Sequence, residues 1–129
     1  MKKKVILIAV VSALLLVLTA GLALAVNKTC QQDPCGLGTT ADDNLFERNG
    51  ATASDFIQGL AGRDLADASA NGPGDADNLR GNAGNDVLIT FDGDGLDTAI
   101  GGAGYDVCII DNIPPETTNA NCERVELRP

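Results

Sequence analysis

The residues of this sequence that are best suited to chemistry are aspartates, which recur at regular intervals behind glycine-rich stretches. Seven of them define the pattern, and each is followed by a short apolar run: Asp43, Asp55, Asp64, Asp77, Asp86, Asp97 and Asp106. Aspartate has a short side chain and favours turns, so its carboxylate holds a cation close to the main chain. We therefore predict that these seven aspartates are metal ligands in a stack of turns.

The aspartates belong to a repeated motif. The most regular copies read G-x-A-G-x-D and span residues 59–64, 81–86 and 101–106. Less regular copies span residues 38–43, 50–55, 72–77 and 92–97. The steps between the final aspartates are 12, 9, 13, 9, 11 and 9 residues, so two steps together give 21, 22 and 20. A period of about 21 residues indicates a solenoid whose coils each contain two turns.

Each coil is predicted to contain a turn, a strand, a second turn and a second strand, so that turns one coil apart stack on the same side. One side then holds Asp43, Asp64, Asp86 and Asp106, and the other holds Asp55, Asp77 and Asp97. The additional residues fall just before the second set, so we expect the first side to be regular and the second wider. Residues two positions after these aspartates are expected to point into the core: Leu45, Ile57, Ala66, Leu79, Leu88, Ala99 and Cys108.

Such a core is thin, because aromatic residues make up only 3% of the chain and two of the seven core positions are alanine. Burial contributes roughly 1.5–3 kcal/mol for each large apolar side chain. Over about five such residues, this gain cannot offset the conformational entropy of the repeat region. Bound cations are therefore expected to supply the missing stabilisation.

The repeats resemble the RTX family, the hemolysin-type calcium-binding repeats, whose nine-residue pattern is G-G-x-G-x-D-x-U-x with U a large apolar residue. Residues 101–109 fit the pattern with Cys108 in the apolar position. Residues 81–89 fit with Asn82 in place of one glycine, and residues 59–67 with Leu60 in that place and a small Ala66 as U. The looser copies lack some glycines and contain insertions.

This resemblance implies an all-β fold, a parallel β-roll (β-solenoid), in which Ca²⁺ lies between stacked turns. The aspartate carboxylates and the backbone carbonyls of the turns would coordinate it, since calcium takes six to eight oxygen ligands and glycines let carbonyls converge. Four further aspartates are either substitute ligands or solvated loop acids: Asp42, Asp75, Asp92 and Asp94.

The N-terminus has the features of a secretory signal peptide. Three lysines precede an uncharged apolar run, residues 5–25, whose last residues Ala23 and Ala25 suit a signal peptidase. Cleavage after Ala25 gives a secreted, extracellular protein without a membrane segment, and an uncleaved membrane anchor is the alternative. We divide the chain into the signal peptide (1–25), an N-terminal cap (26–37), the calcium-binding repeats (38–110) and a C-terminal cap (111–129).

Four cysteines follow the predicted cleavage site, and an even number in an exported chain indicates disulfides. We favour the pairs Cys30–Cys35 and Cys108–Cys122, because the members of each pair are close in sequence and lie at one end of the chain. Zinc binding is disfavoured, because the chain has no histidine and no CxxC pair.

The charge of the chain narrows the classes of function. After removal of residues 1–25 it has 6 basic and 18 acidic residues, a net charge of −12, which argues against nucleic acid as a partner. The lack of histidine, the common general base, argues against an enzyme.

We expect a monomer whose calcium binding is coupled to folding. The alternatives are a disordered acidic chain and an extracellular adhesion or interaction protein that calcium only stiffens. An exposed apolar or aromatic patch would favour the latter, and its aromatic candidates are Phe46, Phe56, Phe91 and Tyr105.

Overall fold

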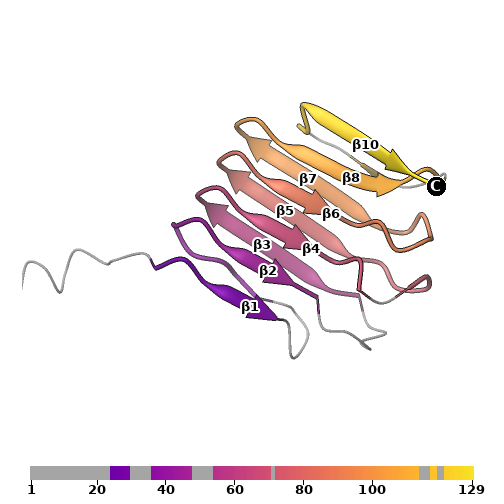
Figure 1. Cartoon of the computed structure of the whole chain (residues 1–129), viewed down its shortest axis with the longest axis horizontal. Coiled ribbons are helices and arrows are strands. Elements are labelled where there is room, and N and C mark those ends of the chain that lie inside the picture. The colour runs from indigo at the N-terminus through magenta and orange to yellow at the C-terminus, as the bar shows by residue number, and fades with distance from the viewer. Residues whose placement is uncertain (1–23, 30–35, 48–53, 71, 114–116, 119–120) are drawn as a thin grey trace, which may run out of the picture.

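The computed structural model describes residues 24–29, 36–47, 54–70, 72–113, 117–118 and 121–129. In these residues the protein is an all-β, parallel β-solenoid, whose coils are stacked from β1 at one end to β10 at the other (Figure 1). Within the same ranges, no helix is long and apolar enough to cross a membrane. The fold class predicted from the sequence is therefore confirmed. The predicted signal run and the pair Cys30 and Cys35 lie outside the described residues, apart from positions 24 and 25.

Two parallel sheets form the walls of the solenoid, with strand orders β1-β2-β4-β6-β8-β10 and β3-β5-β7-β9 (Figure 1). The first sheet comprises β1 (Asn27–Thr29), β2 (Asn44–Phe46), β4 (Leu65–Asp67), β6 (Val87–Ile89), β8 (Val107–Asp111) and β10 (Arg124–Arg128). The second comprises β3 (Phe56–Ala61), β5 (Asn78–Ala83), β7 (Thr98–Ala103) and β9 (Thr117–Thr118). Since β1 pairs with β2 and β10 with β8, the first sheet extends into both segments that were predicted as caps.

The strand registers match the repeat length read from the sequence. In the first sheet, one column of directly paired residues comprises Leu45, Ala66, Leu88 and Cys108. In the second sheet, the corresponding column comprises Ile57, Leu79 and Ala99. All seven are at most 1% exposed, which confirms the predicted core. The aspartate spacing therefore predicts correctly which core residues are paired in successive coils.

The two sides of the solenoid differ in width, as the spacing predicts. On the tight side, three-residue turns join the sheets at residues 62–64, 84–86 and 104–106. On the wide side, the connections are longer and span residues 68–77 and 90–97. The insertions that precede Asp77 and Asp97 therefore lie on the wide side.

The C-terminal end of the solenoid is fastened by a disulfide. Cys108 of β8 is bonded to Cys122, which precedes β10, with a sequence separation of 14. This confirms one of the two predicted pairs. Closing a loop of about 15 residues contributes on the order of 3 kcal/mol in the chain-entropy description.

Candidate metal centre

The seven predicted ligands are buried at the inner corners of the solenoid and form hydrogen-bonded ladders from coil to coil. On the tight side, one carboxylate oxygen of each aspartate accepts the backbone N–H of the aspartate one coil earlier: Asp64 from Asp43, Asp86 from Asp64 and Asp106 from Asp86, at 2.8–2.9 Å. Glu123 accepts the N–H of Asp106 in the same way and ends this ladder. On the wide side, Asp77 accepts from Asp55 and Asp97 from Asp77, at 2.7 and 2.8 Å.

The first glycine of each regular repeat provides the space for the aspartate of the same repeat. A Cβ atom on Gly81 would overlap Oδ2 of Asp86, and a Cβ on Gly59 would overlap Oδ2 of Asp64. The first glycine and the final aspartate of G-x-A-G-x-D, which are five residues apart, therefore face each other inside the tight turn. The carboxylate occupies the volume that the missing side chain of glycine leaves.

In five of the seven aspartates, the second carboxylate oxygen is available for a further ligand. Within the described residues, Oδ2 is buried without a hydrogen-bond partner in Asp64, Asp77, Asp86, Asp97 and Asp106. Burial raises the pKa of Asp77 and Asp86 to about 6 and that of Asp97 to about 7. A buried charge is costly unless it is paired or bound to a metal. These oxygens therefore require either a proton or a cation.

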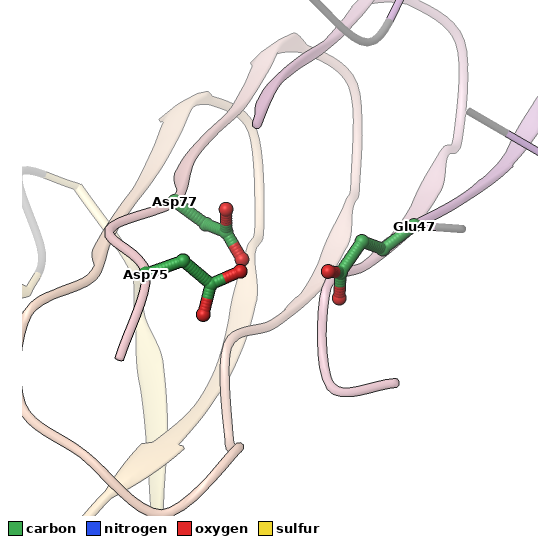
Figure 2. Close-up of side chains that lie close together, drawn as sticks. All are labelled: Glu47, Asp75 and Asp77. Atoms are coloured by element: carbon green, nitrogen blue, oxygen red, sulfur yellow. The ribbon is translucent and has the colours of Figure 1, made fainter. Parts of the chain in front are cut away.

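Three carboxylates converge on the wide side and form what we call the inner group: Glu47, Asp75 and Asp77 (Figure 2). One oxygen of each lies within 4.8 Å of an oxygen of the other two. The three residues are 3%, 6% and 2% exposed, respectively. Calcium–oxygen distances are about 2.3–2.6 Å, so 4.8 Å is close to the span between opposite ligands around one calcium ion.

Each carboxylate of the inner group keeps one oxygen without a hydrogen bond. Glu47 Oε2 accepts the N–H of Ala70 at 3.3 Å, and Asp77 Oδ1 accepts that of Asp55. Glu47 Oε1, Asp75 Oδ2 and Asp77 Oδ2 are buried and have no partner among the described residues. Burial, with the carboxylates of Asp77, Asp75 and Asp55, raises the pKa of Glu47 to about 8. A cation held by these three oxygens would relieve that repulsion.

A second set of three carboxylates adjoins the first and is called the outer group: Asp75, Asp92 and Asp94. One oxygen of each carboxylate again lies within 4.8 Å of an oxygen of the other two, and Asp92 and Asp94 are half-buried. Asp94 accepts the N–H of Gly74 at 2.6 Å and that of Leu96 at 2.8 Å. Burial, followed by the charges of Asp94, Asp75 and Asp111, raises the pKa of Asp92. Asp75 belongs to both groups.

The predicted ligands are therefore distributed unevenly. Of the seven, Asp77 is the one that the structure brings into a group of three carboxylates, while the others are arranged along the ladders. Asp75, Asp92 and Asp94, which the sequence left open as ligands or loop acids, all lie in these groups. Asp42 instead accepts the N–H of Arg63 at 2.8 Å, beside a hollow on the tight side that Asp43 and Asp64 also line.

Glu47 is the member of the site that the sequence pattern missed. It follows Asp43 and Leu45 in steps of two residues, and this alternation along a strand places all three on the inner face. Asp43, Leu45 and Glu47 are indeed buried, whereas Asn44 and Phe46 are not. An acidic residue at an inward position was the available signal.

Comparison with known proteins gives no match, since no family model, no curated protein and no solved structure is significantly similar to the chain. The resemblance of the repeats to the RTX family therefore stays a prediction.

Proposed function

We propose that the protein is a secreted calcium-binding β-solenoid in which Ca²⁺ neutralises the buried carboxylates and is coupled to folding. The observation that supports this most is the inner group: Glu47, Asp75 and Asp77 are buried, bring one carboxylate oxygen each within 4.8 Å of the others, and each have a buried oxygen without a partner among the described residues. Like charges so close, and so far from water, disfavour one another's ionisation. A divalent cation offsets both the repulsion and the lost hydration.

Calcium fits the donor set better than zinc or magnesium does. All donors are carboxylate oxygens, whereas zinc sites in proteins are built mainly from cysteine and histidine, and the chain has no histidine. Magnesium requires near-ideal octahedral geometry at about 2.0–2.1 Å and keeps several waters. Calcium accepts irregular sets of six to eight oxygens, such as long loops provide.

The tight side offers further positions for calcium between stacked turns. Asp64, Asp86 and Asp106 have a buried Oδ2 without a partner among the described residues. The carbonyl oxygens of Gly62 and Gly84 lie against the glycine that follows them one coil later. Under this proposal the chain remains incompletely folded where calcium is scarce and folds outside the cell, where calcium is abundant.

Calcium titration of the metal-free protein tests the proposal. We expect heat of binding by calorimetry and a gain of β signal by far-UV circular dichroism, with a much weaker response to magnesium. Asp75→Asn and Asp86→Asn should each remove part of the bound calcium and weaken binding by about 10-fold or more, by analogy with the 10–100-fold losses at supporting residues of metal sites.

Asp67→Asn is the matched control for these variants. It removes the same charge, but Asp67 lies on the outer face of β4 and accepts hydrogen bonds from Ser69, which an asparagine oxygen can also accept. Its calcium binding should equal that of the wild type. A folded, metal-free protein that gives no response to calcium at tens of millimolar would contradict the proposed function.

A second candidate function is an extracellular interaction protein that calcium stiffens. The outer face of the first sheet presents a patch of half-buried apolar residues: Phe46, Leu65, Val87, Ile89, Val107 and Ile109. Strand pairing places Leu65, Val87 and Val107 in one row and Ile89 beside Ile109 in the next. Calcium-dependent retention on a phenyl matrix, reduced in Ile89→Lys but not in Asp67→Asn, would favour this function. Equal retention of both variants would count against it.

The other three aromatic residues, Phe56, Phe91 and Tyr105, do not extend this patch. Phe56 belongs to the second sheet, where Arg80 lies over its ring at 5.3 Å. Tyr105 is 55% exposed in a tight turn, and Phe91 lies in a wide-side connection. The apolar face is therefore mainly aliphatic.

A further inference from the structure

We infer that the wide side holds two neighbouring cations, one in the inner group and one in the outer group, bridged by the carboxylate of Asp75. This inference rests on the proposed calcium binding and specifies where it occurs. Asp75 is the shared member of the two groups, each of which brings three carboxylate oxygens within 4.8 Å of one another. A carboxylate has two oxygens and can therefore bind one ion through each.

The buried state of Asp75 points to a ligand. The residue is 6% exposed, and its Oδ2 has no hydrogen-bond partner among the described residues. Figure 2 shows its side chain directed toward Asp77, with Glu47, which directly follows β2, facing both. A buried carboxylate oxygen without a donor is costly, and no lysine or arginine is ion-paired with Asp75 in the described part of the chain.

The charges favour two ions over one. The inner and outer groups contain five carboxylates in all. A single Ca²⁺ in the inner group would leave Asp92 and Asp94 unneutralised beside a site that is already occupied. A second Ca²⁺ in the outer group would bring the combined charge of the centre close to zero, which lowers the cost of burying it.

The outer carboxylates are held in place by backbone donors from two coils. The N–H groups of Gly74 and Leu96 fix Asp94, and Asp92 accepts the N–H of Asp94 at 3.1 Å. The N–H groups of Asp92 and Gly93 are in turn bound by Asp111 at 3.0 and 2.9 Å. The connection 90–97 is thus shaped to present both carboxylates toward Asp75.

The two groups differ because the inward position of Glu47 is not acidic in later coils. Backbone hydrogen bonds place Glu47, Ala68 and Thr90 at equivalent positions after β2, β4 and β6. Ala68 and Thr90 supply no carboxylate, so a second ion must take its ligands from the loop, where Asp92 and Asp94 lie. The centre then joins three successive coils, through Glu47, Asp75 and Asp94.

Counting bound calcium in the full chain tests the inference, with equilibrium dialysis against radioactive calcium as the measurement. Glu47→Gln removes a ligand of the inner group alone, Asp92→Asn one of the outer group alone, and Asp75→Asn the shared ligand. We expect the first two variants to lose about one ion each and Asp75→Asn to lose about two, because each site needs its full oxygen set. The control Asp67→Asn should lose none.

The outcomes separate this inference from the proposed function. If the wild type binds calcium but Asp92→Asn retains every ion, or Asp75→Asn loses no more than Glu47→Gln, the two-cation centre is wrong while calcium binding stands. If the wild type binds none, both are wrong. Far-UV circular dichroism checks that each variant folds. Should Asp75→Asn not fold, the double variant Glu47→Gln/Asp92→Asn decides, because its losses add to about two ions only if the groups hold separate ions.

Discussion

Replacing Gly62 with alanine is expected to destabilise the protein by about 2–6 kcal/mol, from about 1–3 kcal/mol of backbone strain and about 1–3 kcal/mol of steric overlap. The same change at Gly74 is expected to cost the strain alone. Both glycines have a φ of 125°. A Cβ on Gly62 would lie 2.6 Å from the carbonyl carbon and oxygen of Ala41, whereas no atom of the described residues lies within 4 Å of a Cβ on Gly74.

The overlap at Gly62 cannot be relieved by a side-chain movement. Ala41 contributes backbone atoms from the tight turn one coil earlier, and the N–H of Gly62 donates to the carbonyl of Ala83 one coil later at 3.0 Å. Moving residue 62 away from Ala41 would therefore disturb its contact with the next coil. The tight side has this glycine because its coils stack backbone against backbone.

Urea unfolding of the two variants without metal ions is the measurement, followed by far-UV circular dichroism at about pH 5, where the buried carboxylates are protonated and the metal-free fold is most stable. Removing metal keeps the result independent of calcium, since Gly74 donates a hydrogen bond to Asp94 of the outer group. Equal losses of unfolding free energy at both positions would show that the tight side can expand, and would contradict close stacking of its turns.

The architecture could be predicted from the sequence because successive coils repeat the same motif at a similar spacing. Glycines and aspartates fix where turns occur, and the alternation of short and long steps fixes which turns share a side. The residue two positions after each aspartate then has to face inward, as Leu45 and Leu88 do. The insertions before Asp77 and Asp97 likewise predicted a wider side.

The candidate metal centre was less predictable, because it depends on loop residues that meet only after the coils have stacked. In the sequence, Asp42 and Asp75 are equally plausible loop acids. In the structure, Asp42 accepts a hydrogen bond from Arg63, while Asp75 is buried and shared by two acidic groups. Glu47 belongs to no repeat of the motif, and its role follows from the longer connection 68–77, which brings Asp75 and Asp77 to it.

Without calcium, the free energy of unfolding is expected to decrease as the pH rises from about 5 to about 8. Burial raises the pKa of Asp77 and Asp86 to about 6, that of Asp97 to about 7 and that of Glu47 to about 8. In the unfolded chain such groups titrate near pH 4. A group whose pKa is raised by folding contributes stability that is complete below its unfolded pKa and is lost as the pH rises through its folded pKa.

Glu47→Gln separates the inner group from the other carboxylates. An amide at this position does not ionise, so the variant should lose the part of the decline between about pH 7 and 8, where Glu47 titrates. The control Asp67→Asn should follow the wild-type profile. Thermal unfolding in the absence of metal ions, at intervals of one pH unit, measures both. A metal-free protein that is more stable at pH 8 than at pH 5 would contradict the burial of these acids in protonated form.

Calcium should reverse this dependence on pH. Calcium binds ionised carboxylates, so the buried negative charges that oppose folding at high pH in the metal-free chain become ligands, and at lower pH calcium must first displace their protons. At millimolar calcium, the unfolding temperature should therefore rise between about pH 5 and 7, where the metal-free protein weakens. Ligand-linked stability grows with the ratio of free calcium to its dissociation constant. The pH at which the unfolding temperatures with and without calcium begin to differ therefore marks where the buried carboxylates exchange protons for calcium.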